Sequence, residues 1–101
     1  IEFVDGGYSD PDEATPNFDD LLNNLMIGRR FIHDTFGVLP TVAWDVDAFG
    51  HSDENTRLLA ELGYDAMFFS RLDESEKVQR SGQQAMNFLW RPSTDSFGPR
   101  W

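Results

Sequence analysis

The sequence of 101 residues has no cysteine, few basic residues and no long apolar run. Without cysteine it can form neither a disulfide nor a thiolate metal site, which leaves the redox compartment open. Lys and Arg number 8 against 18 Asp and Glu, and the resulting charge of −10 would repel a nucleic acid, so we expect none as a partner. No run approaches the roughly 20 apolar residues that span a bilayer, so we expect no membrane segment.

The composition nevertheless predicts a packed chain. Hydrophobic residues make up 40% and aromatic residues 14% of the sequence, which is too much for a disordered segment. The length allows one core at most. Because the chain starts abruptly in an apparent strand and stops without a closing element, we expect residues 1–101 to be a single partial domain of a longer protein.

Short apolar runs alternate with a helical pattern. A period near 3.6 predicts a helix that begins with Thr15 as N-cap and Pro16 in its first turn and ends at Gly37. A second helix is predicted from Ser52 to Gly63. The predicted strands are 1–4, 41–44 (apolar enough to be covered on both faces), 65–69 and, after a polar stretch over 73–84, 86–90. This alternation predicts the α/β class with βαβ crossovers and a parallel sheet.

Ligands of parallel α/β sheets bind at the carboxyl ends of the strands. Asp45, Asp47 and His51 follow the strand predicted at 41–44, and Asp47 with His51 could form part of an oxygen and nitrogen site of the kind that suits zinc. Alternatively, these two residues only cap the loop and the start of the helix. Asp45 would share a face with Asp47 only if the strand continued.

Other residues near these strand ends also have two interpretations. Arg71 could donate hydrogen bonds to Asp47 across a parallel sheet, or it could form an ion pair with Asp73 or Glu74. Phe49 and Trp44 could stack on a sugar or belong to the core. Asp12-Glu13 could be an acid and base pair, or a solvated or capping feature.

The segment around Asp47 resembles a known family. Trp44-Asp45-Val46-Asp47-Ala48-Phe49-Gly50-His51-Ser52 closely resembles the W-x-I-D-P-F-G-H-S segment of the glycoside hydrolase family 38 α-mannosidases. Residues 6–14 resemble its G-G-W-x-x-x-D-E-A, and residues 68–73 resemble its F-F-G-R-L-D. The order is collinear over almost the whole chain, although Ala48 replaces the usual Pro and Tyr8 the usual Trp.

The resemblance implies a role for each matched residue. Asp47 matches the residue that is both the catalytic nucleophile and a zinc ligand. Phe49 matches a residue that lines the sugar pocket, and Arg71 matches one that hydrogen-bonds the nucleophile. His51 belongs to the motif without being a zinc ligand, so it is expected to support the site. Asp45 occupies a variable position, which removes it from the metal hypothesis.

The resemblance also implies a fold and a function. The fold would be a parallel-sheet βαβ segment of a (β/α)7-barrel-like glycosidase catalytic domain. The function would be part of a zinc-dependent retaining α-mannosidase that hydrolyses terminal α-linked mannose of N-glycans or oligosaccharides. The remaining zinc ligands and the acid/base would come from the remainder of the parent enzyme, outside this chain. The F-F-S-R-L-D and W-R-P-S stretches resemble the lysosomal and vacuolar branch more closely than the others.

Two other functions remain open on the sequence. One is a metal-dependent carbohydrate deacetylase, which would activate water at an Asp and His metal site. The other is a noncatalytic fragment that binds sugar. Residues flanking this chain in the parent protein would distinguish these from a mannosidase.

The resemblance predicts that the isolated 101 residues are inactive. With only one of the family's zinc ligands and no acid/base, the chain should neither bind zinc tightly nor hydrolyse p-nitrophenyl α-mannoside. Equilibrium dialysis with zinc and a colorimetric assay would check this. Turnover by a pure, zinc-loaded preparation of this chain would contradict it.

Overall fold

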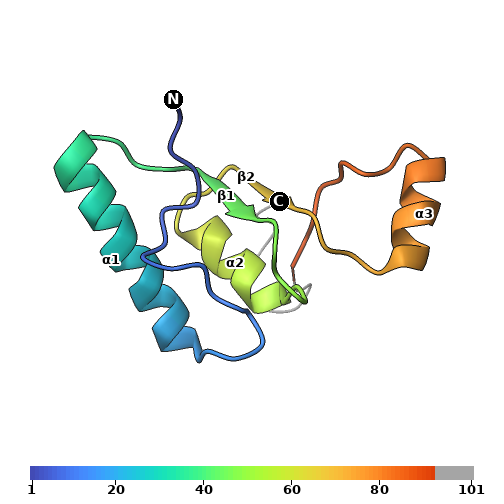
Figure 1. The fold of residues 1–101 in the computed structure, drawn as a ribbon, viewed down its shortest axis with the longest axis horizontal. Coiled ribbons are helices and arrows are strands. Elements are labelled where there is room, and N and C mark those ends of the chain that lie inside the picture. The colour runs from blue at the N-terminus through green and yellow to red at the C-terminus, as the bar shows by residue number, and fades with distance from the viewer. Residues whose placement is uncertain (93–101) are drawn as a thin grey trace.

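The computed structural model describes residues 1–92; residues 93–101, which include Ser93 of the W-R-P-S stretch, lie outside the described part. Within residues 1–92, three helices and two strands follow one another (Figure 1). In order they are α1 (Phe18–Phe36), β1 (Val42–Asp45), α2 (Asp53–Glu61), β2 (Ala66–Phe69) and α3 (Glu74–Gly82). The predicted α/β class is therefore confirmed.

The two strands pair in parallel, as predicted. Their register joins Val42 to Ala66 and Asp45 to Phe69, a constant offset of 24 residues. The helix α2 connects them, and its N-cap is Ser52 as predicted, since the Ser52 side chain accepts a 3.0 Å hydrogen bond from the Asn55 N–H.

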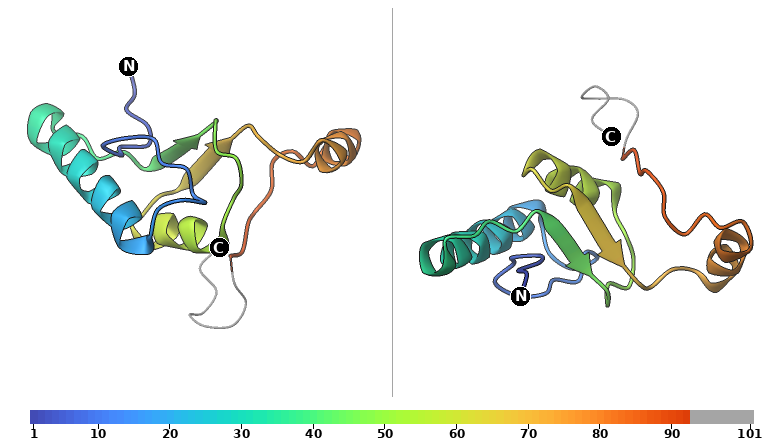
Figure 2. Two further views of the ribbon diagram at one scale, coloured as in Figure 1. Left: turned by 60° about the horizontal axis from the view of Figure 1, so that its bottom comes forward. Right: turned by 90° about the horizontal axis from the view of Figure 1, so that it is seen from above.

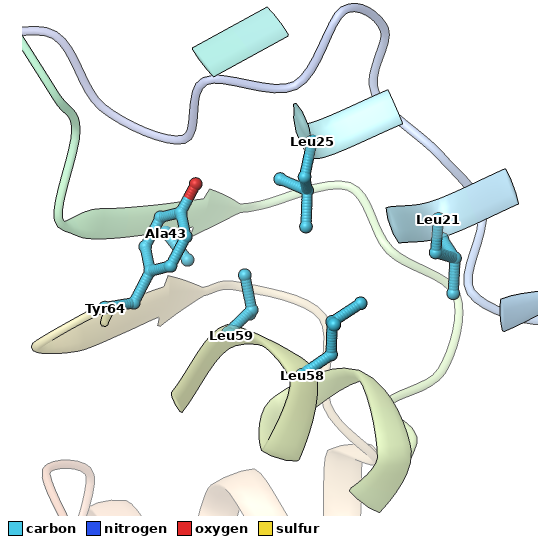
Figure 3. Close-up of a cluster of buried hydrophobic side chains, with 6 residues drawn as sticks. All are labelled: Leu21, Leu25, Ala43, Leu58, Leu59 and Tyr64. Atoms are coloured by element: carbon cyan, nitrogen blue, oxygen red, sulfur yellow. The ribbon is translucent and has the colours of Figure 1, made fainter. Parts of the chain in front are cut away.

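A single core joins the sheet to α1 and α2. Figure 3 shows Leu21 and Leu25 of α1 pointing toward Leu58 and Leu59 of α2. Ala43 of β1 and Tyr64, which precedes β2, complete the cluster. The core therefore fixes the sheet from one side and places the carboxyl ends of both strands at a common edge.

The other face of the sheet is open within the described residues. Trp44 is 45% and Phe68 is 56% exposed, and their rings lie side by side at 5.8 Å. The prediction that the first of these strands is covered on both faces is therefore wrong for this part of the chain. Side chains alternate across a strand, so covering Ala43 leaves Trp44 on the opposite face.

The N-terminal segment differs from its prediction. Residues 1–4 form no strand, because the backbone pairing with β1 is limited to a 2.7 Å bond from the Asp5 N–H to the Val42 carbonyl. Phe3 instead packs on Phe36, with ring centroids 4.7 Å apart. The backbone then turns sharply, at φ 58° for Asp5 and φ 100° for Gly6.

The ends of α1 are only partly as predicted. Gly37 ends the helix in the left-handed conformation, as expected. The N-cap is Asn17 rather than Thr15, because the Thr15 N–H and hydroxyl both bond the Asp12 carbonyl and hold Thr15 in a turn before the helix.

The polar stretch after β2 contains a helix that the hydrophobic pattern did not predict. The Asp73 side chain caps α3 by accepting hydrogen bonds from the N–H groups of Ser75 and Glu76 at 3.0 and 3.2 Å. No residue of α3 is buried, and the helix stands apart from the sheet and from the other helices (Figure 2). The strand predicted at 86–90 is also wrong, since this segment has no ladder partner among residues 1–92.

None of the helices within residues 1–92 has both the length and the apolar character needed to cross a membrane.

The loop before α1 is held against the helix by close backbone contacts. The Tyr8 N–H donates to the Asn24 carbonyl at 3.1 Å, and the Asn24 side chain exchanges two 2.9 Å hydrogen bonds with the backbone of Ser9. A Cβ atom on Gly28 would lie 2.2 Å from the Gly6 carbonyl oxygen, so this contact requires glycine.

We expect Gly28→Ala to destabilise the parent protein by about 3 kcal/mol, because its methyl group would collide with backbone that cannot move independently. Gly82→Ala is the matched control, since Gly82 is also helical but has nothing near its Cβ position. The control should be neutral or stabilising by up to about 1 kcal/mol. Denaturant unfolding measures both, and equal stabilities would disprove the close contact.

Candidate functional site

Asp47 and Arg71 lie two residues beyond the last paired residues of their strands. They differ by the same 24 residues that relate Asp45 to Phe69, so the parallel register places them opposite each other. Arg71 Nε donates to Asp47 Oδ1 at 2.7 Å, and Nη2 lies 2.5 Å from the same oxygen. The predicted contact is confirmed. Asp73 is instead used as the cap of α3.

Phe49 lies beside this ion pair. The Arg71 guanidinium carbon is 4.6 Å from the centroid of the Phe49 ring, and Phe49 is 71% exposed. Phe49 therefore does not belong to the core, and much of its ring remains available to a ligand. Trp44 is exposed too, but it packs on Phe68 in the sheet.

His51 holds the backbone of Arg71. Its Nε2 lies 2.7 Å from the Arg71 carbonyl oxygen, and a carbonyl only accepts, so Nε2 donates this bond. The imidazole ring packs against Phe69 at 4.7 Å, and the side chain is 12% exposed. Nδ1 is buried without a hydrogen-bond partner and lies 3.9 Å from Glu13 Oε1. His51 thus contacts the backbone of Arg71, while the cap of α2 is Ser52.

Glu13 has a capping role, the second of the two interpretations that the sequence allowed for Asp12-Glu13. Its side chain is 4% exposed and reaches across to α2, where Oε2 accepts from the Ser52 N–H at 2.6 Å and Oε1 accepts from Asn55 Nδ2 at 2.9 Å. Asp12 points elsewhere and accepts from the Ala14 N–H in its own loop. The two residues therefore form no acid and base pair. Glu13 is a capping residue, but for a helix some 40 residues away, which local spacing does not reveal.

Asp45 has an unusual environment at the end of β1. Burial, a hydrogen bond with Glu13 and the negative charges of Glu13, Asp10 and Asp5 raise the pKa of Asp45 to about 7. The strand ends at Asp45, so Asp45 and Asp47 do not share a face of the sheet. The strand does not continue to Asp47, so the two carboxylates are not paired on one face.

Two groups of side chains could supply ligands to the expected metal. Among the described residues, Glu13, Asp45 and His51 offer ligand atoms that all lie within 4.8 Å of one another. In this group Glu13 already accepts from Ser52 and Asn55, and the raised pKa of Asp45 favours its protonated form, so a metal would have to compete with these hydrogen bonds and with a proton. Asp47 fits better, because Arg71 contacts only Oδ1 and the side chain is 62% exposed, which leaves Oδ2 open to a cation.

A cleft of about 750 Å³ opens next to Phe49 and Arg71. Arg80 and Phe88 line its opposite side, where Arg80 stacks on the Phe88 ring at 4.3 Å. The volume and the mixture of aromatic and charged walls suit a polar ring-shaped ligand such as a sugar. The cleft, the ion pair and Phe49 thus meet at the carboxyl edge of the sheet.

Comparison with known proteins places the sequence in a family. The sequence model described as the glycosyl hydrolases family 38 N-terminal domain matches residues 1–97. The chain is 43% identical over 101 residues to a lysosomal alpha-mannosidase of Mus musculus, covering 98% of the chain and 10% of that relative. It is 40% identical over 96 residues to the lysosomal alpha-mannosidase of Dictyostelium discoideum, covering 95% of the chain and 9% of that relative. An alpha-mannosidase of Canavalia ensiformis is 38% identical over 94 residues, covering 92% of the chain and 10% of that relative. The chain thus spans about a tenth of the length of the curated relatives it matches.

The raised pKa of Asp45 predicts a pH-dependent stability. The pKa of Asp45 is higher in the folded than in the unfolded chain. The stability that protonated Asp45 contributes is therefore fully present below about pH 4 and is lost as the pH rises through about 7. Asp45→Asn should therefore match the parent protein at pH 4 and exceed its melting temperature at pH 8. Asp65→Asn, just before β2, controls for net charge. Parallel pH profiles of Asp45→Asn and the parent would contradict the prediction.

Proposed function

We propose, since this chain belongs to the N-terminal domain of glycosyl hydrolase family 38, that it is part of the catalytic domain of a zinc-dependent retaining α-mannosidase. The substrates would be oligosaccharides and glycoprotein glycans that carry terminal α-linked mannose. The observation that carries the proposal is the Asp47 and Arg71 pair at the carboxyl edge of the sheet, beside an exposed aromatic ring and a cleft of about 750 Å³. We infer that the complete domain closes into a barrel-like sheet.

Asp47 would act as the nucleophile. In a retaining glycosidase a carboxylate attacks the anomeric carbon while the bond to the leaving oxygen breaks. That oxygen takes a proton from an acid whose carboxyl group lies about 5 Å from the attacking carboxylate. The resulting glycosyl ester is then hydrolysed by water, and two inversions give net retention. The open Oδ2 of Asp47 and its 62% exposed side chain satisfy the access requirement. The acid/base would come from the remainder of the parent enzyme.

Arg71 and Phe49 would support this attack. Two donors from Arg71 to a single oxygen fix the plane of the carboxylate and balance its charge. Phe49 presents an apolar ring next to the same carboxylate, which is how aromatic side chains bind the apolar face of a sugar. Water would be displaced from this surface as the sugar binds, which strengthens the polar contacts around Asp47.

Asp47 would also be the one zinc ligand of this chain, with the others in the remainder of the parent enzyme. When bound, a zinc ion would hold sugar hydroxyls and so orient and distort the ring. The Asp47 carboxylate provides the hard oxygen donor that such a site needs. The chain's own contribution is to hold that donor at a defined place beside Arg71.

The location of the parent protein follows only from its relatives. The Mus musculus and Dictyostelium discoideum relatives are both named lysosomal. These names support the lysosome or vacuole as the compartment of the parent protein, in agreement with the stretches at 68–73 and 90–93 of the sequence.

We expect Asp47→Ala in the parent enzyme to lower kcat by at least ~10³-fold, because both the nucleophile and a metal ligand are lost. Zinc content, measured by atomic emission, should fall as well. A slow fluorinated mannosyl substrate should label the peptide that contains Asp47, detected by mass spectrometry.

Asp45→Asn is the control for this variant, since it removes a carboxylate two residues away without touching Arg71. It should lower kcat far less. Label on Asp12, Glu13 or Asp45 would show that another carboxylate is the nucleophile. Absence of label together with an inverted product would refute the retaining mechanism, and deacetylase activity would refute the glycosidase.

A further inference from the structure

We propose that Glu13 is a positioning residue for the Asp47 and Arg71 pair, acting through backbone contacts from the loop that precedes α1. The inference rests on the proposed function, because it assumes that this ion pair is catalytic. It concerns a residue that contacts neither member of the pair. Each step is a hydrogen bond of the structure or the peptide bond between His51 and Ser52.

Glu13 anchors the end of the segment that carries the nucleophile. This segment, residues 46–52, leaves β1 after Asp45 and enters α2 after Ser52. At its far end the buried Glu13 carboxylate accepts the Ser52 N–H at 2.6 Å, and it accepts Asn55 Nδ2 at 2.9 Å in the first turn of α2. Bonds between a carboxylate and N–H donors at a helix N-terminus are charge-assisted and among the stronger ones. The segment is therefore fixed at both ends, by the β-ladder and by Glu13.

The same anchor extends to Arg71. His51 immediately precedes Ser52, and its Nε2 donates to the Arg71 carbonyl at 2.7 Å. Arg71 in turn donates from its guanidinium to Asp47. The contacts thus link Glu13 to Asp47 in three steps. Glu13 holds the Ser52 backbone, the neighbouring His51 holds the Arg71 backbone, and Arg71 holds the Asp47 carboxylate. Displacing one member moves the others.

The environment of Glu13 argues against a chemical role. Its side chain is 4% exposed, so a substrate cannot reach it within the described structure. Its two oxygens accept from the Ser52 N–H and the Asn55 amide, so a proton or a cation would have to compete with these bonds. A positioning role makes a distinct prediction, because an uncharged residue with an equivalent acceptor should substitute for it.

The test compares Glu13→Ala and Glu13→Gln in the zinc-loaded parent enzyme. Glu13→Ala leaves the Ser52 N–H unsatisfied and should lower kcat about 30-fold, with KM within about 3-fold, since small displacements of catalytic groups mainly affect the chemical step. Glu13→Gln keeps an oxygen for the Ser52 N–H, and its amide can donate to the Asn55 side chain once that side-chain amide turns over to present its oxygen, so it should restore kcat to within about 3-fold of the parent. Asp12→Asn alters the same loop without touching Ser52 and should be neutral.

A double-mutant cycle separates positioning from a general loss of structure. Arg71→Lys keeps the charge but removes the planar set of donors, so it should lower kcat on its own. If Glu13 acts through Arg71, adding Glu13→Ala to Arg71→Lys should cost less than about 3-fold more. Effects that simply multiply would overturn the proposal. So would a Glu13→Gln variant as inactive as Glu13→Ala, or one that has lost its zinc, because these would indicate a chemical or metal-binding role.

Two further measurements keep the outcome clear. If Glu13→Ala does not fold, His51→Leu replaces it, since it removes the donor to the Arg71 carbonyl and leaves Glu13 in place. It should reproduce the kcat loss and its dependence on Arg71, and a normal kcat would overturn the proposal. Asp47→Ala is assayed in parallel. An active Asp47→Ala variant refutes the proposed function, whereas an inactive one with a normal Glu13→Ala refutes only this inference.

Discussion

The parallel register of β1 and β2 is the constraint on which the candidate site depends. The strands pair over only four residues each, yet their offset of 24 residues continues beyond the ladder and sets Arg71 opposite Asp47. A slip of one residue would turn each side chain to the other face and would set Val46 or Ala48 against Arg71. The stacking of Arg71 on Phe49 and the bond from His51 to the Arg71 carbonyl depend on the same register.

A second constraint is the excess of negative charge at this edge of the sheet. Asp45, Glu13 and Asp47 all gather there in a chain of charge −10. The structure stabilises each in a different way. Glu13 accepts backbone and amide donors at the start of α2, Asp45 is favoured in its protonated form, and Asp47 is paired with a guanidinium. Of the three, Asp47 has the exposed side chain, which separates residues that look alike in the sequence.

The sequence predicted what depends on local pattern. The helix ending at Gly37, the Ser52 cap, the parallel strands and the Arg71 contact were all readable from periodicity, capping residues and strand order. What it did not predict depends on contacts between distant segments. A short apolar run at 1–4 was read as a strand because the pattern cannot show that a ladder partner is missing. The helix α3 has caps but no apolar stripe, so the hydrophobic pattern does not predict it. A capping role for Glu13 is among the expectations, but the helix that it caps is remote in sequence and could not be predicted.

The isolation of α3 has a consequence for the cleft. Within the described residues this helix buries no side chain, so its order rests on the Asp73 cap and on local pairs such as Arg80 with Glu76 at 2.7 Å. A nine-residue helix of this kind is close to the limit of independent stability. Its backbone amides should therefore exchange with solvent through local opening, well before those of β1 and α2. The cleft thus has one wall built on the sheet and another that includes α3, so local opening of α3 should change the width of the cleft.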